Sequence, residues 1–468
     1  MDRVAREVSR VAAEGAEMAR VRVPLARRAA AVGAAWLALV GGLSAGANGP
    51  AHAAPHTAPH TAVTPAPPAA VEVVTGVVRK VVGERAGVAQ PLLQAGRRLV
   101  PLAVGSLPAN RDGDVVRAVL LPDLGGGHRV RSATTLRTAA AAAPTGVHRV
   151  YVAIVRPRGV ASDKALTKAS AAAAVRRAAS YWRGQTGGRV RFQVAAVKAP
   201  YVSAHRCTAG VARLWAEALE RFDVPTGRGA HLMLFAPRAA VGQGCDYGLG
   251  TIGGTGGPGL TFVTETAQSL VAHELGHNLG LRHAGALHCR GRQDARLRGG
   301  RWPSACRREE YGDLLDVMGY SGRAYGEGNL NAVNLHAMGL LPGAVRTIGS
   351  PGRYRVRVRP LSASPRSTRA VRIVERSGQV YFVEYRTNTG RDRAARRNRH
   401  RPALGVRVLR LNPQGSGGAL VLDATPSRGN DYANNLAPGR RFTSASGRLT
   451  VRVVRAGPSG ATVEITRR

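Results

Sequence analysis

Lysine is almost absent from this chain of 468 residues, in which only Lys80, Lys164, Lys168 and Lys198 occur. Acidic residues number 28 against 68 basic ones, so the formal charge of +40 comes almost entirely from arginine. In a chain rich in Ala and Gly, this is typical of GC-rich coding bias rather than of selection for an anionic partner. The positive electrostatic field of the protein would still attract anionic polymers and cell surfaces non-specifically. No basic motif interleaved with aromatic residues is present, so we predict no specific nucleic-acid partner.

Long apolar runs are missing from the chain after its N-terminal segment. The one run extends from Ala29 to about Ala47 and follows several arginines. Ala51-His52-Ala53 then provides a small-x-small cleavage site, which predicts a signal peptide over residues 1–53. We therefore expect a secreted, extracellular protein whose mature chain has no membrane span. Arg27-Arg28 leaves the export route open.

Cysteine is scarce as well, and all four cysteines follow residue 200: Cys207, Cys245, Cys289 and Cys306. No CxxC spacing occurs, which disfavours a cysteine-based zinc site. An even number in an exported chain predicts two disulfides with three possible connectivities, and we favour Cys207–Cys245 and Cys289–Cys306. The second would close a short loop, with a stabilisation of roughly 3 kcal/mol. Because the N-terminal region has no cysteine, latency through a thiolate on a metal is excluded.

One eleven-residue run, HELGHNLGLRH, fits the pattern HExxHxxGxxH. His273 and His277 are four residues apart, share one face of a helix and can converge on one metal ion, with Glu274 beside the open position of that metal. Gly280 can leave the helix with a positive φ, so that His283 supplies a third ligand. Three neutral nitrogens with one open position suit a catalytic zinc, whereas a structural zinc has four protein ligands. The alternative is a solvated helix that happens to carry histidines.

This pattern, followed by a methionine turn at Asp316-Val317-Met318-Gly319-Tyr320, resembles the metzincin zinc peptidases. The preceding phrase Glu310-Tyr311-Gly312-Asp313 looks most like the gametolysin family. The resemblance covers about residues 147–342. It implies that Met318 is a structural floor beneath the histidines. It also implies that Tyr320 stands where some metzincins carry a tyrosine that binds zinc or the developing oxyanion, the alternative being a packed tyrosine with its hydroxyl bonded elsewhere.

The resemblance implies a zinc-dependent endopeptidase that acts on a protein or peptide substrate with one catalytic Zn²⁺. Histidines 273, 277 and 283 would hold the zinc, Glu274 would be the general base, and the substrate would lie extended against a sheet edge. Three alternatives stay open: a catalytically silent metzincin-like domain, a protein that binds polyanions or cell surfaces, and hydrolysis of an ester or of another amide. No EF-hand-like loop is present, so the sequence does not indicate whether calcium is bound.

We predict four regions along the chain: a signal peptide (1–53), a linker and propeptide (54–146), a metzincin-like catalytic domain (147–342) and a C-terminal β domain (345–468). The linker is an Ala-Pro-His-Thr repeat typical of unstructured spacer, with weak metal binding by its histidines as the alternative. Inhibition by the propeptide would use a carboxylate, among Asp112, Asp114 and Asp123, or steric cover alone.

The catalytic region alternates between strand and helix patterns, as expected of an α/β (α+β) domain. The expected strands are 150–155, 189–194, 230–236 and 260–263, and the expected helices are 163–182 with Asp163 as N-cap, 208–222, the zinc helix from about 266, and 330–338. The glycine-rich segment 242–259 is expected to form the rim of the substrate cleft. Short strands at 353–359, 380–385, 406–411, 419–422, 449–454 and 461–465 predict an all-β, sandwich-like C-terminal domain.

Two arginine-rich segments bear on what the protein binds. Between the third histidine and the methionine turn lie Arg290, Arg292, Arg296, Arg298, Arg301, Arg307 and Arg308. If some face the cleft, the enzyme should prefer acidic or neutral residues on the leaving-group side, the alternative being coding bias without effect. The run 391–401 holds six arginines and His400 and is either a solvated loop or a polyanion-binding patch.

Overall fold

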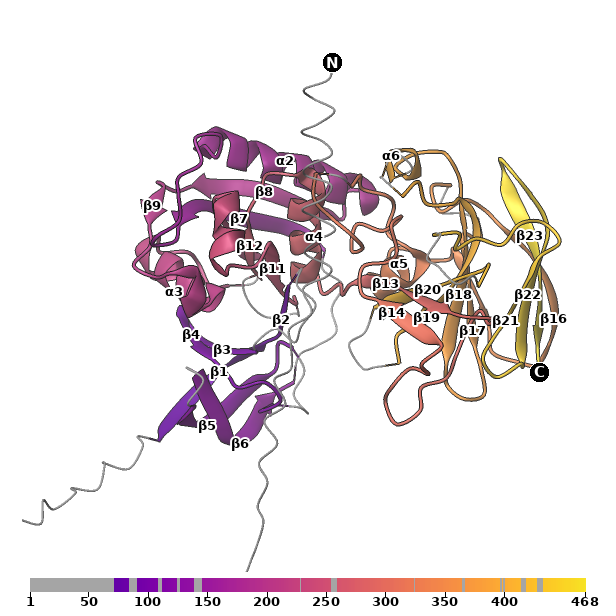
Figure 1. Cartoon of the computed structure of the whole chain (residues 1–468), viewed down its shortest axis with the longest axis horizontal. Coiled ribbons are helices and arrows are strands. Elements are labelled where there is room, and N and C mark those ends of the chain that lie inside the picture. Colours follow the sequence, from indigo (N-terminus) through magenta and orange to yellow (C-terminus); the bar gives the residue numbers. More distant parts are fainter. Residues whose placement is uncertain are drawn as a thin grey trace, which may run out of the picture. The chain divides into compact units, whose positions relative to one another are not determined.

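The computed structural model describes residues 71–83, 91–107, 112–123, 127–138, 145–227, 229–253, 259–323, 325–363, 367–395, 398, 400–413, 418–426 and 432–468. The predicted signal peptide and most of the predicted linker lie outside them. All described residues fall within one unit, Pro67–Arg468, and form four β-sheets (Figure 1). In this part of the chain no helix is long and apolar enough to cross a membrane.

The region predicted to be a propeptide contributes an antiparallel sheet in the order β4-β3-β1-β5-β6. Its strands are β1 (Glu72–Arg79), β3 (Leu92–Ala95), β4 (Arg98–Pro101), β5 (Val115–Asp123) and β6 (Gly127–Arg137). Val116, Ala118 and Leu120 of β5 are buried at every second position, as expected of a strand with one covered face. They pack with Val78 and Leu93 in a small apolar cluster.

The central sheet follows the order β2-β11-β12-β10-β7-β8, with β9 beside β7. Its strands are β2 (Val81–Gly83), β7 (Gly146–Arg156), β8 (Val190–Val197), β9 (Tyr201–Val202), β10 (Ala230–Phe235), β11 (Gly248–Thr251) and β12 (Gly259–Val263). The pairs among β8, β7, β10 and β12 are parallel, while β11 and then β2 run antiparallel to their neighbours. The four strands predicted in this region are thus confirmed, and β11 is an additional strand within the glycine-rich segment.

Helices cover both faces of the central sheet, which explains why β10 and β12 are buried at every position. They are α2 (Lys168–Gln185), α3 (Val211–Arg221), α4 (Gln268–Asn278) and the 3₁₀ turns η1 (Cys207–Ala209) and η2 (Arg238–Gln243). Val150 and Val152 of β7 pack with residues of α2 and α4, whereas Ala153 and Val155 belong to the cluster that contains α3. The zinc helix predicted from the sequence is α4.

The first helix of this region begins later than predicted. Thr167 is the N-cap of α2, because its hydroxyl accepts from the Ser170 N–H at 3.1 Å while the Ser170 hydroxyl accepts from the Thr167 N–H at 2.8 Å. Asp163, the predicted N-cap, instead accepts from the Ala165 N–H in the preceding turn. The reciprocal pair satisfies two open N–H groups, which favours the helix start at Lys168.

The C-terminal part contains a seven-stranded sheet, β14-β13-β20-β19-β18-β17-β15, and a four-stranded sheet, β16-β23-β22-β21. Their strands are β13 (Ala284–Cys289), β14 (Cys306–Glu309), β15 (Val345–Ile348), β16 (Gly352–Val358), β17 (Ala370–Val374), β18 (Val380–Arg386), β19 (Gly405–Leu411), β20 (Ala419–Leu422), β21 (Arg441–Thr443), β22 (Leu449–Gly457) and β23 (Gly460–Arg467). Two short helices, α5 (Ala332–Ala337) and α6 (Asp392–Ala395), accompany them. Residues of both sheets, such as Val383 and Val463, share one apolar cluster.

All six strands predicted after residue 345 are present, as β16, β18, β19, β20, β22 and β23. The strands β15, β17 and β21 were not predicted, because each has five residues or fewer and contains an arginine, so none shows a continuous apolar run or a long alternation. The predicted boundary at 342–345 falls between α5 and β15. However, β13 and β14, which precede that boundary, belong to the same sheet as β15, through the parallel pairing of β13 with β20.

Candidate metal centre

The helix α4 carries the first two histidines, and the chain turns directly after it to bring the third histidine towards them. It stops at Asn278, and Gly280 has a φ of 91°, as predicted from the motif. The Gly280 N–H donates to His277 O at 2.8 Å and the Leu281 N–H donates to Gly276 O at 3.1 Å, which closes the helix end. Only glycine adopts this backbone conformation without strain, so the turn that brings back the chain depends on it.

The side chains of His273, His277 and His283 converge on one point. One ring nitrogen of each lies within 4.8 Å of the others, and the Nε2 atoms of His273 and His277 are 3.1 Å apart. This spacing suits two atoms that face a common metal ion. The Nε2 atom of His283 has no hydrogen-bond partner although it is buried, so its lone pair is also available to a metal.

Each imidazole is held by its other nitrogen. The three acceptors at the Nδ1 atoms are Val317 O at 2.8 Å for His273, Leu281 O at 2.9 Å for His277 and the Glu310 carboxylate at 3.0 Å for His283. An N–H at Nδ1 leaves the lone pair on Nε2, which is the arrangement that metal-binding histidines require. The donor set therefore fits a zinc ion with three protein ligands and an open position.

The electrostatic surroundings keep two of these rings neutral. Burial, together with the neighbouring His273, lowers the pKa of His277 and the pKa of His283 well below the usual value for histidine. The charges of Arg282 and Arg308 lower the pKa of His283 further. Neutral imidazole is the form that binds a metal, so these two ligands are prepared for an ion across the physiological range of pH.

Glu274 is fully buried beside the histidines and faces the strand β11. A Cβ atom on Gly250 of β11 would lie 2.9 Å from Glu274 Oε2 and 3.0 Å from His277 Cβ. Any side chain at position 250 would therefore displace the carboxylate. The need for glycine at position 250 was not visible in the sequence, because Gly250 is one of several glycines in the glycine-rich segment 242–259.

Met318 lies against the helix that carries the histidines and is fully buried. Its sulfur sits so close to Gly276 that a Cβ atom there would be 2.4 Å away. The turn around it is fixed by bonds from the Met318 N–H to Asp316 at 2.8 Å and from the Ala284 N–H to Met318 O at 2.8 Å. The same turn supplies the Val317 carbonyl that holds His273.

Tyr320 does not direct its hydroxyl towards the histidines. The hydroxyl bonds to Glu309, and the ring stacks on Tyr325 with centroids 5.5 Å apart. This position agrees with the alternative of a packed tyrosine bonded elsewhere. Tyr311 is the aromatic residue at the centre, since its ring centroid lies 4.2 Å from that of His283 and 6.1 Å from that of His273.

The strand β2, from the predicted propeptide, covers the edge of the central sheet at the metal centre. Gly83 lies opposite Leu249, and Val82 lies opposite Gly250, the residue that adjoins Glu274. The Tyr311 hydroxyl donates to the carbonyl of Gly83 at 2.5 Å. No pattern in the sequence indicates this contact, because β2 is only three residues long.

Of the three propeptide carboxylates considered, Asp112 lies beside the covering segment. It accepts from the Lys80 N–H at 2.6 Å, directly before β2. Burial raises the pKa of Asp112 to about 6, against the opposing charges of Arg79 and Arg282. Asp123 pairs instead with Arg129, and Asp114 is buried. Asp112 is not part of the group of metal-ligand atoms found among the described residues.

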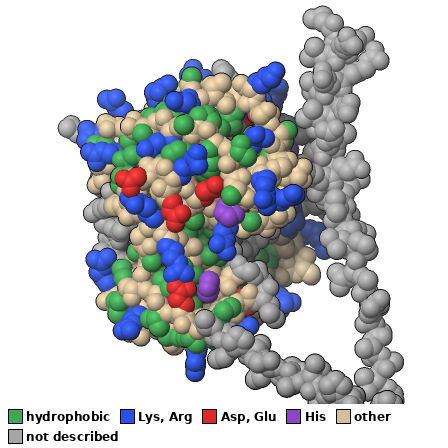
Figure 2. Space-filling model, turned by 90° about the vertical axis from the view of Figure 1, so that its left-hand side faces the viewer, with side chains coloured by type: hydrophobic (Ala, Val, Ile, Leu, Met, Phe, Trp, Pro, Cys, Tyr) green, Lys and Arg blue, Asp and Glu red, His purple; other side chains and the backbone are tan. Residues whose placement is uncertain are grey.

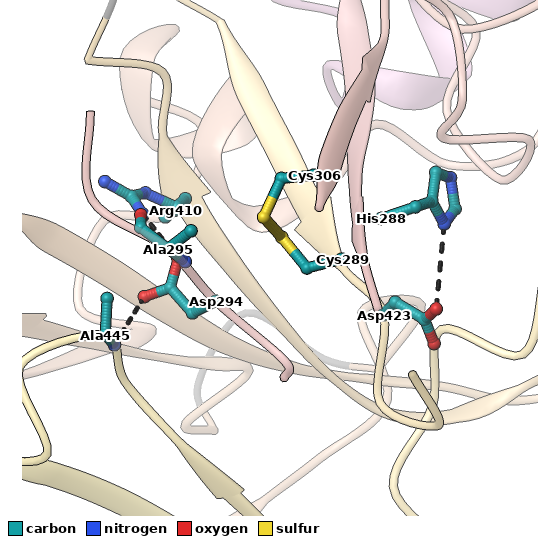
Figure 3. The surroundings of a disulfide bond; sticks show 8 residues. All are labelled: His288, Cys289, Asp294, Ala295, Cys306, Arg410, Asp423 and Ala445. Carbon is teal, nitrogen blue, oxygen red and sulfur yellow. Dashed lines mark hydrogen bonds and ion pairs between the residues drawn. A yellow bond between two sulfur atoms is a disulfide. The ribbon is translucent and has the colours of Figure 1, made fainter. Parts of the chain in front are cut away.

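The structure contains both disulfides in the predicted pairing, Cys207–Cys245 and Cys289–Cys306. The second joins β13 to β14, at residues that lie opposite each other in the sheet. The loop that it closes is anchored on the C-terminal strands, where Asp294 pairs with Arg410 and accepts from the Ala445 N–H at 3.0 Å (Figure 3).

The arginines of this loop therefore differ in what they can influence. The middle of the loop lies on the C-terminal strands, because Arg410 pairs with Asp294 and donates to the Ala295 carbonyl at 2.7 Å. Arg308 is the member of the set that acts on the metal centre, because it pairs with Glu310 and its charge lowers the pKa of His283. In the second arginine-rich segment, Arg391 lies over the ring of Tyr181 and Asp392 pairs with Arg386, so its start is packed against other elements.

Three oriented histidines with a carboxylate beside them are the features of a metallopeptidase centre. The family model of Peptidase M66 matches residues 205–303, which contain all three histidines and Glu274, and this match supports a metallopeptidase. Among solved structures, the crystal structure of metalloproteinase-II from Bacteroides fragilis is similar over 58% of this chain and 78% of its own. The identity is 11% and the TM-score 0.24, too low to establish a shared fold. No curated protein matches the chain in sequence.

Proposed function

We propose that this chain is a secreted zinc endopeptidase of the metzincin clan, most like the gametolysin family, that hydrolyses protein or peptide substrates. The observation that carries the proposal is the set of three histidines whose Nδ1 atoms are all engaged, so that their Nε2 atoms face one point beside Glu274. The match to Peptidase M66 over this segment supports the same assignment.

The residues of the metal centre have three different roles. A zinc ion bound by His273, His277 and His283 would lower the pKa of a bound water and polarise the scissile carbonyl. Glu274 would accept a proton from the attacking water and deliver it to the leaving amine, a role that suits a buried carboxylate held beside the ligands. Met318 supports the histidines through packing and takes no part in the chemistry.

The substrate lies extended along β11. This strand pairs with β12 on one side, and its other side is the position that β2 fills. An extended peptide in the place of β2 would add a strand to the sheet and pass the carboxylate of Glu274. The glycine-rich segment that contains β11 thus forms the rim of the cleft.

The coverage of β11 by β2 supports a zymogen in which the N-terminal region blocks the cleft. The block uses the main chain of residues 81–83 rather than a ligand to the metal, which suits a region without cysteine. Release requires cleavage or displacement of this region. The Ala-rich segment 138–146, at the end of the predicted propeptide, is the processing region in this proposal, and it ends at Gly146, the first residue of β7.

The competing functions are less well supported. A silent domain is disfavoured because every residue of the HExxH centre is present and oriented. A polyanion-binding protein would need a concentrated basic surface, whereas Figure 2 shows basic side chains scattered over the visible face among acidic and apolar ones. Hydrolysis of an ester or of another amide uses the same chemistry and is distinguished only by the substrate.

The test compares the full chain with its Val81→Asp variant, in which a charge placed in the apolar contact of β2 opens the cleft. We expect hydrolysis of casein or gelatin that a chelator abolishes, with one zinc per chain. Glu274→Ala should lower kcat by about 1000-fold while retaining zinc, and Glu220→Ala, an exposed glutamate on α3, should have no effect. A protein without zinc would overturn the proposal, and zinc without hydrolysis in any variant would indicate a silent domain.

A further inference from the structure

Tyr311 combines two contacts that no other described tyrosine has. Its ring packs against His283, and its hydroxyl donates to the main-chain carbonyl of Gly83 at 2.5 Å. We infer that Tyr311 is a substrate-binding residue that donates a hydrogen bond to a main-chain carbonyl of the peptide in the cleft. The inference rests on the proposed function.

The strand β2 occupies the position that a substrate would take. It pairs antiparallel with β11, and the residue opposite Val82 is Gly250, whose Cα adjoins the carboxylate of Glu274. The carbonyl of Gly83 therefore belongs to a peptide that passes directly beside the metal centre. Since the hydrogen bond uses only main-chain atoms of that peptide, any substrate in the same register would offer the same acceptor.

The position of the Tyr311 side chain is fixed by contacts other than its bond to Gly83. The residue is 5% exposed, and its ring lies between His283 and Tyr320, with centroid distances of 4.2 Å and 5.7 Å. Its carbonyl accepts from the Tyr320 N–H at 3.0 Å, which ties it to the end of the methionine turn. A donor held in this way loses little freedom when the acceptor arrives, and so contributes its full hydrogen bond.

Tyr320 cannot supply this donor in the conformation observed. Its hydroxyl bonds to Glu309, which also accepts from the Tyr432 hydroxyl at 3.2 Å and pairs with His288. Reaching the cleft would require Tyr320 to leave this network and its stacking on Tyr325. The geometry therefore favours Tyr311.

The first experiment uses the full chain and does not depend on hydrolysis. Hydrogen exchange of the amides in residues 80–83 is compared between the wild type and Tyr311→Phe. Loss of one hydrogen bond should speed local opening of this segment by about 10-fold. The matched control is Tyr385→Phe, which removes a part-buried hydroxyl that donates to the Gly457 carbonyl at 3.0 Å in the C-terminal part.

The second experiment uses the Val81→Asp chain, in which the cleft is open. Tyr311→Phe should lower kcat/KM for a peptide substrate by about 10-fold or more, while Tyr385→Phe leaves it unchanged. With Glu274→Ala added, a labelled peptide of the sequence Arg-Lys-Val-Val-Gly should bind about 10-fold more weakly to Tyr311→Phe than to its parent.

The outcomes separate the two proposals. Weaker peptide binding without hydrolysis in any variant would contradict the peptidase but support Tyr311 as the carbonyl donor. Faster exchange in the full chain with unchanged kcat/KM and peptide binding would show that Tyr311 holds only β2, and would overturn the inference. If Val81→Asp does not fold, the test rests on hydrogen exchange in the full chain. Unchanged exchange of residues 80–83 in Tyr311→Phe would then overturn the inference about Tyr311, and faster exchange would support it.

Discussion

At the scale of single residues, the orientation of the third histidine depends on a side chain. His273 and His277 bond to main-chain carbonyls, which no substitution removes directly. His283 bonds instead to Glu310, which is also paired with Arg308. Glu310 therefore positions a ligand without touching the metal itself, and such partners commonly raise metal affinity by 10-fold to 100-fold.

We expect Glu310→Ala to weaken zinc binding by about 10-fold to 100-fold, because His283 loses the acceptor that selects its tautomer. Glu310→Gln should recover part of the affinity, since the amide oxygen still accepts from Nδ1. Competition with a chelating dye measures the affinity. Glu220→Ala serves as the control. Equal affinity in all four proteins would show that the contact between His283 and Glu310 is incidental.

The ligands could be predicted from the sequence, but their partners could not. His273, His277 and Gly280 belong to one helix and its end, where spacing alone determines geometry. Gly250 and Tyr311 reach the centre through strand pairing and packing between segments far apart in the chain, which no local pattern encodes. The disulfide pairing was predictable because the preferred partners are also neighbours in sequence.

At the scale of elements, the short strand β2 controls access to β11. Val81 is 7% exposed and packs in an apolar cluster with Leu249, Leu92 and Leu99. A carboxylate at position 81 would be buried without a partner, at a cost that exceeds the few hydrogen bonds of a three-residue strand. The packing of Val81 therefore keeps β2 on β11, as expected if the propeptide covers the cleft sterically.

In the full chain, Val81→Asp should raise the hydrolysis of a peptide substrate by about 10-fold or more, because β2 leaves the edge of the sheet. Val73→Asp is the matched control, since Val73 lies on β1 in the same region and is 53% exposed. Rates are measured with a quenched fluorescent peptide at equal zinc content. An equal rise in both variants would indicate general loosening of the N-terminal sheet instead of release of β2.

The carboxyl of Asp112 makes the stability of this arrangement depend on pH. Its pKa is about 6 in the folded chain and near 3.8 when unfolded, so between these values the folded state binds more protons. Stability contributed by this group is therefore present at low pH and is lost as the pH rises towards 6. The loss comes from burial of the ionised carboxylate, since the hydrogen bond from the Lys80 N–H favours the ionised form.

The variant Asp112→Asn should be about as stable as the wild type near pH 4. Above pH 7 it should be more stable by about 1–2 kcal/mol, a value reduced because Asp112 is partly exposed. Urea unfolding at several values of pH between 4 and 8 measures the difference. A constant difference across that range would show that Asp112 does not titrate as inferred.

At the scale of the whole molecule, buried ion pairs join the methionine turn to the C-terminal strands. Arg407 of β19 forms ion pairs with Asp313 at 2.6 Å and with Glu384 of β18 at 3.1 Å. Arg386 forms an ion pair with Asp392 at 3.2 Å and donates to the Asn329 carbonyl at 2.9 Å. The segment around the turn is thus held by residues almost a hundred positions further along the chain.

This explains why the sequence predicted the C-terminal strands but not their relation to the metal centre. Alternation of apolar residues predicts a strand, but not which strand it pairs with. Here β13 follows His283 directly and pairs with β20, at Ala284 opposite Ala419. The position of the segment that carries the third histidine therefore depends on a sheet whose strand β20 begins only at residue 419. The predicted boundary at 342–345 consequently does not separate two independent sheets.

Replacement of Arg407 by Met should be strongly destabilising, because it leaves Asp313 and Glu384 buried without their common cation. Removing one partner of a buried ion pair typically costs about 3–5 kcal/mol. The control is Arg452→Met, which removes an exposed guanidinium paired with Glu464 at 3.5 Å and should change stability by less than about 1 kcal/mol. Urea unfolding of both variants gives the free energies.

The same substitution should weaken zinc binding, although Arg407 is remote from the histidines in sequence and bonds to none of them. Asp313 is bonded to Arg407 and accepts from Asn331 at 3.1 Å, and the Asp313 N–H donates to the Ala284 carbonyl, next to His283. If Asp313 becomes mobile, the backbone next to His283, the third ligand, becomes mobile as well. Zinc affinity measured under conditions where Arg407→Met is still folded should be lower than in Arg452→Met. A folded Arg407→Met protein with unchanged zinc affinity would mean that the C-terminal strands stabilise the chain without supporting the metal centre.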